Sequence, residues 1–575
     1  MILLFLFLCS LSHAAIVNLT YGQIEGAELK YRDHTVYHAF KKVPYAKPPL
    51  GKLRFAVPEK PLPWNGIWNA SVYGPACMSN SSVTSSPQKW VDENCLHLNF
   101  FVSEKCLHNG GCPVVFYIHG GDVFYDSAVM FNDTKLYETF VSEDIVLVIV
   151  GYRLGIFSHL TFATQEVAKY NIALYDLIRG LEFIHSEVDK FGGDPAKVTI
   201  FGHSFGGELV HLLAYSQNID PEGKLFYKAV AMSASAEFEI KTEQIDVTME
   251  FAKRSKCYPT GINESDTVHD NYILECLQKL DQFELLRIQR AIEEEGIFTL
   301  PSGVLNERPL LTGDENIFKN PKKIPYLLGT TLHELDMSLT HLNMSQLLGY
   351  RNYHELDTKF QKDFKEGYFG ETSEETIAFF VVAKLIANTQ YSTGAPVYLY
   401  SFREPAKSFH TDDLSYLFGI HAFEQNTNQK VLAKLYPKYF TNFIKFGIPS
   451  PDWPPFNPIL DTFYNVNVDL KKKIAPHADI KYEHKTVKYW FEDMKKLDNL
   501  ITARKTISQK ANLIELTPIP EEDYFYLTFT FAIVIFFIGI CLGRYVFTRR
   551  QDVIVQIIDE RTPLFPYEKN AERIF

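Results

Sequence analysis

Short, almost wholly apolar runs recur along the first 400 residues of the chain and alternate with stretches of helical spacing. Strands that are apolar on both faces are typical of a parallel sheet covered by helices on both sides. Between two of these runs, residues 173–191 carry apolar side chains at the three- and four-residue spacing of a helix. The pattern predicts an α/β fold with a mixed, mostly parallel central sheet. The best strands are residues 113–120, 145–152, 197–202, 228–234, 324–330 and 396–402.

A longer apolar run lies near each end of the chain. Residues 524–547 carry no acidic or basic side chain before Arg544, and their length suits a helix that crosses a bilayer. Acidic residues precede this run and arginines follow it, so the positive-inside rule predicts a type I membrane protein. A buried core helix is the alternative interpretation. Residues 1–14 resemble a cleaved signal peptide, although they lack the usual Lys or Arg at the start.

These runs divide the chain into five parts. After the signal peptide we expect one luminal or extracellular α/β domain (16–514), a stalk (515–523), a transmembrane helix (524–547) and a cytoplasmic tail (548–575). No linker rich in Pro, Gly or Ser interrupts residues 16–514, which is why we expect a single domain there.

Composition excludes several classes of protein. The formal net charge is −12, and no basic stripe offsets it, so we expect no nucleic-acid partner. No phosphate-binding loop and no zinc-type Cys/His spacing occurs, so we expect no cofactor and no metal. Six Asn-x-Ser/Thr sequences support entry into the secretory pathway and predict glycosylation. They are Asn18, Asn69, Asn80, Asn132, Asn263 and Asn343.

The cysteine count agrees with an oxidising compartment. Of the eight cysteines, Cys9 lies in the expected signal peptide and Cys541 in the expected membrane helix. The even number that remains suggests disulfides, and pairing of nearest neighbours would close three short loops. A metal site would need tighter Cys/His spacing. The six are Cys77, Cys95, Cys106, Cys112, Cys257 and Cys276.

One candidate nucleophile stands in the stretch VTIFGHSFGGELV, residues 198–210. An apolar strand leads to Gly202, a turn centres on Ser204, and a helical pattern follows. In a Gly-x-Ser-x-Gly turn the serine backbone is strained, and the glycines avoid collisions between neighbouring side chains. The alternative is a structural serine in a glycine-rich bend. The strand before the turn and the helix after it favour the nucleophile.

A serine hydroxyl needs a base and an acid that orients it, and in α/β-hydrolases these follow in the order serine, acid, histidine. Glu334 follows the strand at 324–330 and offers the acid. His410 follows the strand at 396–402 and offers the base, whereas His421 falls within a helical pattern. The sequence therefore predicts a Ser204–His410–Glu334 triad.

The loop after the strand at 113–120 offers an oxyanion hole. It reads His119-Gly120-Gly121-Asp122. Backbone N–H groups of Gly121, Asp122 and Phe205 would bind the oxygen of a tetrahedral intermediate. The alternative is a simple Gly-Gly turn with no catalytic part. It fits less well, because the two glycines directly follow a fully apolar strand.

Several blocks in order carry a resemblance to the type-B carboxylesterases, the cholinesterase-like α/β-hydrolases. They are FKKVPYAKPPLGKLRFAVPEKPLPWNGIWNAS, ENCLHLNFFV, GYRLGIF, FGGDPAKVTIFGHSFGG, LLGTTLHE and HTDDLSYLFG. The resemblance implies an α/β-hydrolase fold and the same triad. It also implies the disulfides Cys77–Cys95 and Cys257–Cys276 and the ion pairs Arg54–Glu93 and Arg153–Asp176. Cys106–Cys112 lies outside the family pattern and is expected from proximity alone.

The chain departs from the family pattern at several positions. Asp122 replaces a Gly or Ala in the oxyanion loop, and its carboxylate would oppose the forming oxyanion. We expect Asp122 to turn away or to bind a substrate hydroxyl. Phe205 replaces an Ala and Leu335 a Gly, while Trp90 is out of register with the choline-binding tryptophan of cholinesterases. We therefore do not expect acetylcholine as substrate.

Three functions fit this sequence. We expect first a hydrolase of small-molecule esters that forms an acyl-serine, and second an acyltransferase that passes the same acyl group to an acceptor. Residues 559–565, DERTPLF, resemble an acidic dileucine signal that a sorting adaptor would bind. This tail suggests the nematode carboxylesterase-like group, some of which assemble acylated glycosides in lysosome-related organelles. A neuroligin-like adhesion protein is the third function. It ranks last because such relatives lose the nucleophile, whereas this chain keeps all three triad residues. A homodimer is also expected.

Overall fold

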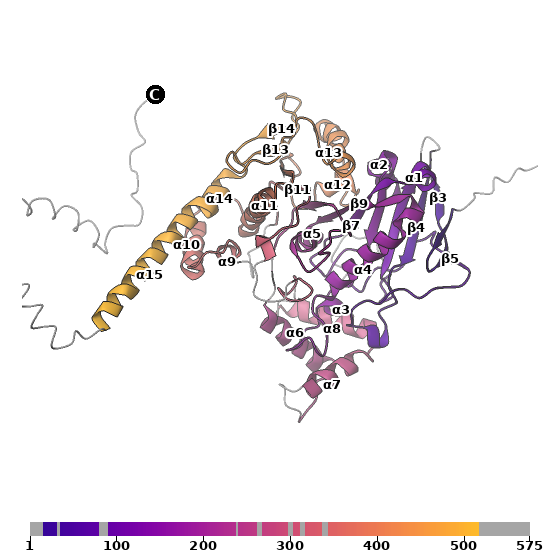
Figure 1. Ribbon diagram of the computed structural model, residues 1–575, viewed down its shortest axis with the longest axis horizontal. Helices are drawn as coiled ribbons and strands as arrows, with labels where there is room; N and C mark the ends of the chain where they lie inside the picture. Colours follow the sequence, from indigo (N-terminus) through magenta and orange to yellow (C-terminus); the bar gives the residue numbers. More distant parts are fainter. Residues whose placement is uncertain are drawn as a thin grey trace, which may run out of the picture. The chain divides into compact units, whose positions relative to one another are not determined.

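The computed structural model describes most of the chain between residues 15 and 516 (Figure 1). Two units are distinguished, residues 1–498 and 499–575, and the described part of the second is the end of one helix. The described ranges are 15–31, 35–79, 90–236, 238, 240–261, 267–296, 303–310, 317–335 and 343–516.

The six expected strands lie side by side at the centre of the main sheet and are all parallel. Their spatial order is β12-β11-β10-β9-β7-β8. The prediction of a parallel centre is therefore confirmed. The strands are β7 (Cys112–Ile118), β8 (Val146–Val150), β9 (Gly193–His203), β10 (Lys228–Met232), β11 (Tyr326–Thr331) and β12 (Val397–Phe402).

Further strands flank this centre and make the sheet mixed. Beyond β8 come three antiparallel strands, and beyond β12 come β13 and β14, of which β14 is antiparallel to β13. A separate small sheet has the order β1-β2-β5. The bounds are β1 (Ile16–Leu19), β2 (Gly22–Glu25), β3 (Ala27–Lys30), β4 (Val36–Pro44), β5 (Ile67–Asn69), β6 (His97–Ser103), β13 (Phe463–Val466) and β14 (His477–Asp479).

Helices cover both faces of the central strands, as the apolar pattern of those strands requires. On β7, Phe116 faces α4, where a Cβ on Gly180 would lie 3.1 Å from the phenyl ring. The next residue, Tyr117, faces the opposite core, where its ring lies 4.0 Å from that of Phe418. The α-helices of the described residues are α1 (Glu104–Asn109), α2 (Asp133–Thr139), α3 (Ile156–His159), α4 (Ile172–Glu187), α5 (Phe205–Tyr215), α6 (Lys241–Arg254), α7 (Thr267–Leu277), α8 (Gln282–Glu295), α9 (Met344–Leu347), α10 (Tyr353–Lys365), α11 (Glu374–Ser392), α12 (Leu414–Leu417), α13 (Thr427–Phe446), α14 (His484–Lys488) and α15 (Met494–Leu516).

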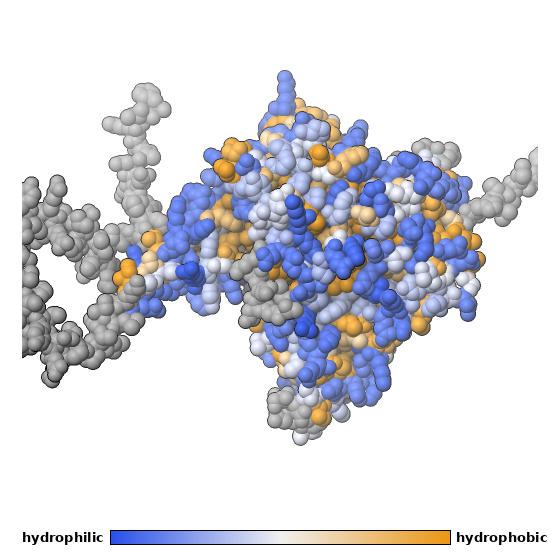
Figure 2. All heavy atoms as spheres, viewed as in Figure 1, coloured by the Kyte–Doolittle hydropathy of each residue, from blue (hydrophilic) through white to orange (hydrophobic). Residues whose placement is uncertain are grey.

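The apolar strands are buried, and the face of the molecule drawn in Figure 2 is mostly hydrophilic with apolar residues scattered over it. The helix expected at 173–191 is confirmed as α4 followed by a 3₁₀ turn, Val188–Phe191. His421 does not lie in a helix, contrary to the sequence pattern. The helix α12 ends at Leu417, and Gly419, with a φ of +72°, turns the chain away before His421.

Three disulfides join Cys77 to Cys95, Cys106 to Cys112 and Cys257 to Cys276, so the expected pairing is confirmed. Both ion pairs implied by the resemblance are also present. The guanidinium of Arg153 binds both carboxylate oxygens of Asp176 at 2.8 and 2.6 Å. Such two-pronged pairs fix the relative orientation of two segments as well as attracting them.

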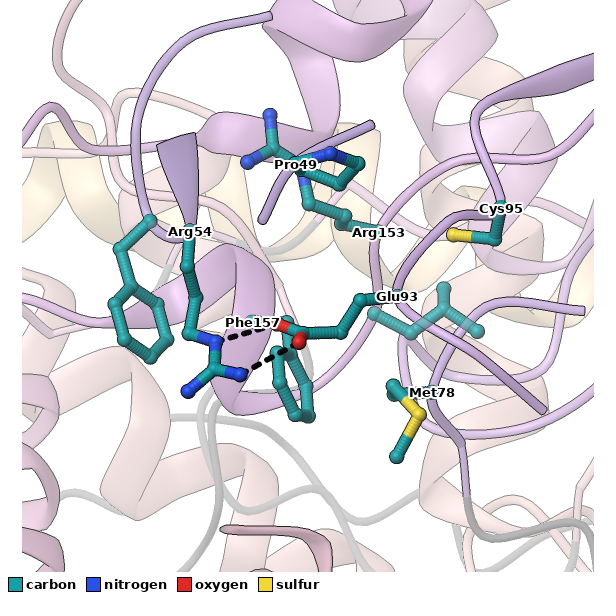
Figure 3. Close-up of a pocket in the computed structure, with 9 residues that line it drawn as sticks. Pro49, Arg54, Met78, Glu93, Cys95, Arg153 and Phe157 are labelled. Carbon is teal, nitrogen blue, oxygen red and sulfur yellow. Dashed lines mark hydrogen bonds and ion pairs between the residues drawn. The ribbon is translucent and has the colours of Figure 1, made fainter. Parts of the chain in front are cut away.

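The Arg54–Glu93 pair lines a small pocket (Figure 3). Arg54 donates from Nε and one terminal nitrogen to the two oxygens of Glu93, both at 2.6 Å. Its other terminal nitrogen donates to the carbonyl oxygens of Leu277 and Leu280 at the end of α7. This side chain therefore ties residues near the N-terminus to α7. Burial raises the pKa of Glu93, and Arg54 opposes the rise.

Several expectations concern parts of the chain outside the described residues. Among the residues that the structure describes, no helix has the length and apolarity needed to span a membrane. The expected signal peptide, membrane helix and tail lie outside these residues, so they stay predictions. The helix α15 runs to Leu516, two residues into the expected stalk.

Candidate active site

Ser204 occupies the sharp turn between β9 and α5, with φ +57° and ψ −130°. This backbone conformation is rare for a residue with a side chain, and such strain amounts to about 1–3 kcal/mol. The turn needs its glycines, because a Cβ on Gly202 would lie 2.1 Å from the carbonyl oxygen of Gly206. A Cβ on Gly206 would lie 2.2 Å from the carbonyl oxygen of Ile118 on β7. Close packing against β7 therefore holds the serine in its strained position.

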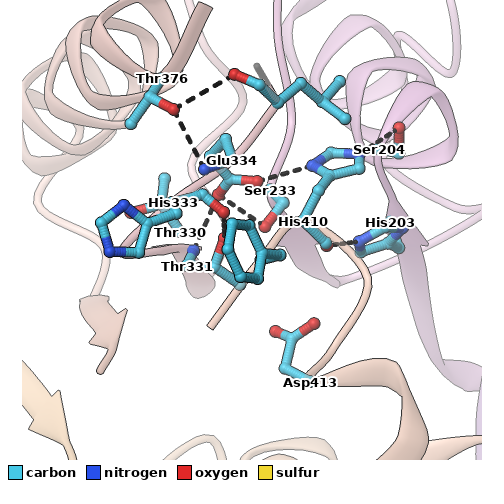
Figure 4. Close-up of polar contacts among 12 residues, drawn as sticks. His203, Ser204, Ser233, Thr330, Thr331, His333, Glu334, Thr376, His410 and Asp413 are labelled. Carbon is cyan, nitrogen blue, oxygen red and sulfur yellow. Dashed lines mark hydrogen bonds and ion pairs between the residues drawn. The ribbon is translucent and has the colours of Figure 1, made fainter. Parts of the chain in front are cut away.

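The structure brings Ser204, His410 and Glu334 together from three loops (Figure 4). His410 Nε2 lies 2.8 Å from Ser204 Oγ, and His410 Nδ1 lies 2.6 Å from Glu334 Oε2. These loops follow β9, β11 and β12, which are parallel and therefore end at the same edge of the sheet. Residues far apart in the sequence thus form one continuous chain of hydrogen bonds.

The carboxylate of Glu334 is fixed by further contacts. Its Oε1 accepts hydrogen bonds from Ser233 Oγ at 2.8 Å and from the backbone N–H of Thr331 at 2.7 Å. Its own backbone N–H donates to Thr376 Oγ1, in the first turn of α11, at 3.1 Å. Oε2 is left to accept from His410 Nδ1. Ser233, Thr331 and Thr376 were not identified from the sequence, because no motif marks them.

Burial sets the electrostatics of this pair. It raises the pKa of Glu334 to about 8, and the bonds from Ser233 and Thr331 oppose the rise. It lowers the pKa of His410 to about 4. The two groups share a hydrogen bond and titrate as a pair. When the His410–Glu334 pair holds a single proton, that proton is on His410 Nδ1 and is donated to the ionised carboxylate of Glu334. Nε2 then has no hydrogen and can accept the proton of Ser204. This form supplies a general base.

The loop after β7 passes directly over the nucleophile. A Cβ on Gly120 would lie 2.7 Å from the carbonyl oxygen of His203 and 3.0 Å from the Cβ of Ser204. Gly121 has a φ of +98° and Asp122 a φ of +49°, so the chain turns sharply at the residues expected to form the oxyanion hole. Phe205, the third expected contributor, is the first residue of α5. The three backbone N–H groups therefore belong to segments that meet at Ser204.

The side chain of Asp122 is exposed. Burial is the main cause that raises the pKa of Tyr125, and the charges of Glu293 and Asp122 add to it. The Asp122 carboxylate thus acts on the hydroxyl of Tyr125, a residue of the same loop. The expectation that it turns away from the oxyanion or binds a substrate hydroxyl stays a prediction.

The expected glycosylation sites fall mostly on the surface. Asn18, Asn69 and Asn132 are exposed, and Asn343 is half-buried. Asn132 and Asn343 accept hydrogen bonds from backbone N–H groups at the starts of α2 and α9 through Oδ1. Their glycosylation stays a prediction. The remaining two, Asn80 and Asn263, lie outside the described residues.

Comparisons with known proteins identify the family of this chain. The sequence model of the carboxylesterase family matches residues 13–490. The pyrethroid hydrolase Ces2a of Mus musculus is 27% identical over 507 residues, 78% of this chain and 87% of the relative. Carboxylesterase 5A of Homo sapiens is 29% identical over 506 residues, 76% of this chain and 84% of the relative.

A third relative is the medium-chain fatty acyl-CoA hydrolase precursor of Anas platyrhynchos, 26% identical over 531 residues, 82% of this chain and 91% of the relative. The family match and the mostly parallel sheet with its covering helices support an α/β-hydrolase fold. The family match spans most of the chain and includes every residue of the hydrogen-bonded site. The chain therefore belongs to the carboxylesterase family and is a serine carboxylesterase.

Proposed function

We propose that this enzyme hydrolyses small-molecule carboxylic esters through an acyl group carried on Ser204. The observation that supports this most strongly is the unbroken hydrogen-bond chain from Ser204 Oγ through His410 to Glu334. A serine hydroxyl becomes a nucleophile when a neighbouring base can take its proton and a third group orients that base. All three requirements have a candidate residue here.

The proposed reaction has two halves. In the first, Ser204 Oγ attacks the ester carbonyl carbon, and its proton moves to His410 Nε2. The N–H groups of Gly121, Asp122 and Phe205 would hold the negative oxygen, each donor contributing about 3–4 kcal/mol to lowering the barrier. The carbon–oxygen bond to the alcohol breaks, and the alcohol leaves with the proton from His410. In the second half, water repeats the attack and releases the acid.

Glu334 has a supporting part in both halves. While His410 holds two protons, its positive charge lies 2.6 Å from the carboxylate. Ser233 and Thr331 keep that carboxylate in place. The charge of Glu334 therefore stabilises the imidazolium that forms during the reaction more than it stabilises the neutral imidazole of the resting enzyme. This difference lowers the barrier.

Ester hydrolysis by purified enzyme tests the proposal. We expect Ser204→Ala to lower kcat for p-nitrophenyl acetate by about 10⁴-fold or more, since removing a nucleophile leaves only binding and the oxyanion hole. Ser142→Ala is the matched control, because that serine is exposed and its Oγ donates to the backbone carbonyl oxygen of Glu138 on α2. Full activity of Ser204→Ala would contradict the proposal.

The same assay distinguishes hydrolysis from acyl transfer. Water and an alcohol compete for one acyl-serine, so adding a sugar or small alcohol as acceptor reveals which reaction prevails. An ester of the acceptor in excess over free acid would assign acyl transfer. Because relatives are named for pyrethroid and fatty acyl-CoA hydrolysis, a pyrethroid ester and an acyl thioester belong in the first substrate panel.

We also propose that the enzyme is a type I protein of the secretory pathway, directed to the plasma membrane or to a lysosome-related organelle. Three disulfides and exposed Asn-x-Ser/Thr sites support an oxidising, glycosylating compartment. Digestion of the full-length chain with an N-glycosidase should increase its mobility on a gel, while an unchanged mobility would contradict the proposal.

A further inference from the structure

A second histidine contacts the base from behind. His203 is the last residue of β9 and directly precedes Ser204. It is buried, and its Nε2 lies 2.7 Å from the backbone carbonyl oxygen of His410 (Figure 4). The two imidazole rings lie 4.8 Å apart with an angle of 49° between their planes. One residue therefore contacts both the backbone and the ring of the proposed base.

The direction of this hydrogen bond fixes the state of His203. A carbonyl oxygen can only accept, so His203 Nε2 must carry the hydrogen. A neutral ring meets this requirement. Burial lowers the pKa of His203 well below its usual value, although the hydrogen bond to the His410 carbonyl opposes this. At neutral pH His203 is therefore a neutral ring that donates from Nε2.

The bond connects two parts of the site that come from different strands. Ser204 follows β9, whereas His410 lies in the loop after β12. Other bonds of that loop join it to segments other than β9. The carboxylate of Asp412 accepts from the backbone N–H of Phe409 within the loop, the carbonyl oxygen of Ser408 accepts from the backbone N–H of His333 in the acid loop, and Asp413 accepts from Tyr436 Oη on α13. Among the hydrogen bonds of the described residues, the one from His203 joins the backbone of His410 to the strand that carries the nucleophile.

We propose that His203 is a positioning residue that fixes the backbone of His410 relative to Ser204 and so keeps the imidazole between Ser204 and Glu334. This inference rests on the proposed function. His410 must keep two bonds at once, 2.6 Å to Glu334 and 2.8 Å to Ser204. A ring anchored only by its side chain could tilt and lose one of them. An anchor at the carbonyl oxygen prevents that tilt.

His203 also determines which charges surround His410. The ring of His410 faces Ser204, the carboxylate of Glu334, the ring of Phe379 on α11 and His203. Glu334 is the anion in direct contact with the imidazolium, and the neutral ring of His203 adds no charge beside it. A carboxylate at position 203 would add a second anion and favour the protonated form of His410.

An isosteric pair of variants gives the sharpest test. His203→Gln places an amide N–H near the position of Nε2, whereas the ionised carboxylate of His203→Glu can only accept and would face a carbonyl oxygen. We expect His203→Gln to keep kcat within about threefold, and His203→Glu to lower it by about 10–100-fold with KM little changed, as for a misplaced catalytic group. The acid limb of the pH profile should also move to higher pH in His203→Glu.

A third variant and a matched control complete the experiment. His203→Leu removes the donor without adding charge, so its kcat should fall as in His203→Glu while its acid limb stays in place. His211→Leu is the control: His211 is also buried, on α5, and its Nδ1 contacts Tyr326 Oη at 2.7 Å. We expect it to lower the melting temperature and to leave the kcat and pH profile of the folded enzyme unchanged.

Two results would overturn the inference: equal kcat and pH profiles for His203→Gln and His203→Glu, or full kcat in His203→Leu. The Ser204→Ala variant separates a failure of this inference from a failure of the proposed function. If Ser204→Ala stays active, the acyl-serine mechanism is wrong. If Ser204→Ala is inactive but His203→Gln and His203→Glu have the same kcat and pH profile, only the positioning role of His203 is wrong.

Discussion

Two buried carboxylates of this enzyme, Glu93 and Glu334, meet different partners. Burial raises the pKa of both. Glu93 is bound at 2.6 Å through each oxygen by Arg54, whose guanidinium does not lose its proton in proteins. Glu334 is bound by a hydroxyl, a backbone N–H and His410, whose imidazole titrates near neutral pH when exposed.

The difference shows how one kind of group serves two purposes. A carboxylate paired with arginine keeps its charge and its geometry, which suits a contact that joins Arg54 to the end of α7. A carboxylate paired with histidine shares a proton with its partner, which suits a site where a proton must move during each reaction. The partner, more than the burial, decides the role.

The largest effect is expected from Glu334→Gln. An amide can donate to Nδ1 and so stabilise the wrong tautomer of His410, in which Nε2 carries the hydrogen and cannot accept one from Ser204. We expect kcat/KM to fall by about 10⁴-fold, as for the corresponding change in other triads. Steady-state ester hydrolysis measures this. A loss of less than tenfold would mean that Glu334 does not orient the base.

Glu93→Gln should give the opposite pattern. It leaves the buried guanidinium of Arg54 without a charged partner, and breaking a buried ion pair in this way destabilises a protein by about 3–5 kcal/mol. Denaturant unfolding should show this loss, while kcat/KM per folded molecule stays near that of the parent. Unchanged stability together with lost activity would erase the distinction between the two carboxylates.

Ser233→Ala sharpens the comparison through pH. Ser233 Oγ donates to Glu334 Oε1 at 2.8 Å and opposes the upward shift of the pKa of Glu334. Without this bond the pair takes up its second proton at higher pH, so the acid limb of kcat/KM should move upward by about one unit, the equivalent of 1.4 kcal/mol. Activity well above the limb should change little.

Ser216→Ala is the control for that shift, because Ser216 is also buried but its Oγ donates to the carbonyl of Leu310. Its acid limb should stay in place. A downward movement in Ser233→Ala would reverse the sign that the hydrogen bond predicts.

The smallest effect is expected from Asp122→Asn. The carboxylate is exposed and therefore screened by solvent, yet it belongs to the loop that passes over Ser204. Removing a negative charge near a forming oxyanion should raise kcat/KM by about two- to tenfold, less at high salt. Asp452→Asn, at another exposed position, should have no effect. A selective loss on polyhydroxylated esters would instead indicate that Asp122 binds a substrate hydroxyl.

The centre of the fold could be predicted from sequence because its strands are apolar on both faces. The antiparallel strands at its edges could not, because strands such as β4, VYHAFKKVP, mix polar and apolar residues without a clear period. Parallel strands that end at one edge explain why Ser204, Glu334 and His410 meet as expected. Ser233, Thr331 and His203 were missed as site residues, because their roles depend on contacts between segments far apart in sequence.

The account depends on an acyl group that forms on Ser204 during turnover. Acid quenching of the enzyme while it hydrolyses p-nitrophenyl acetate, followed by mass spectrometry of its peptides, detects this group directly. We predict one acetyl group on the peptide that contains Ser204, absent from Ser204→Ala. Rapid hydrolysis with no acetyl group on that peptide, or with the group on another side chain, would contradict the mechanism.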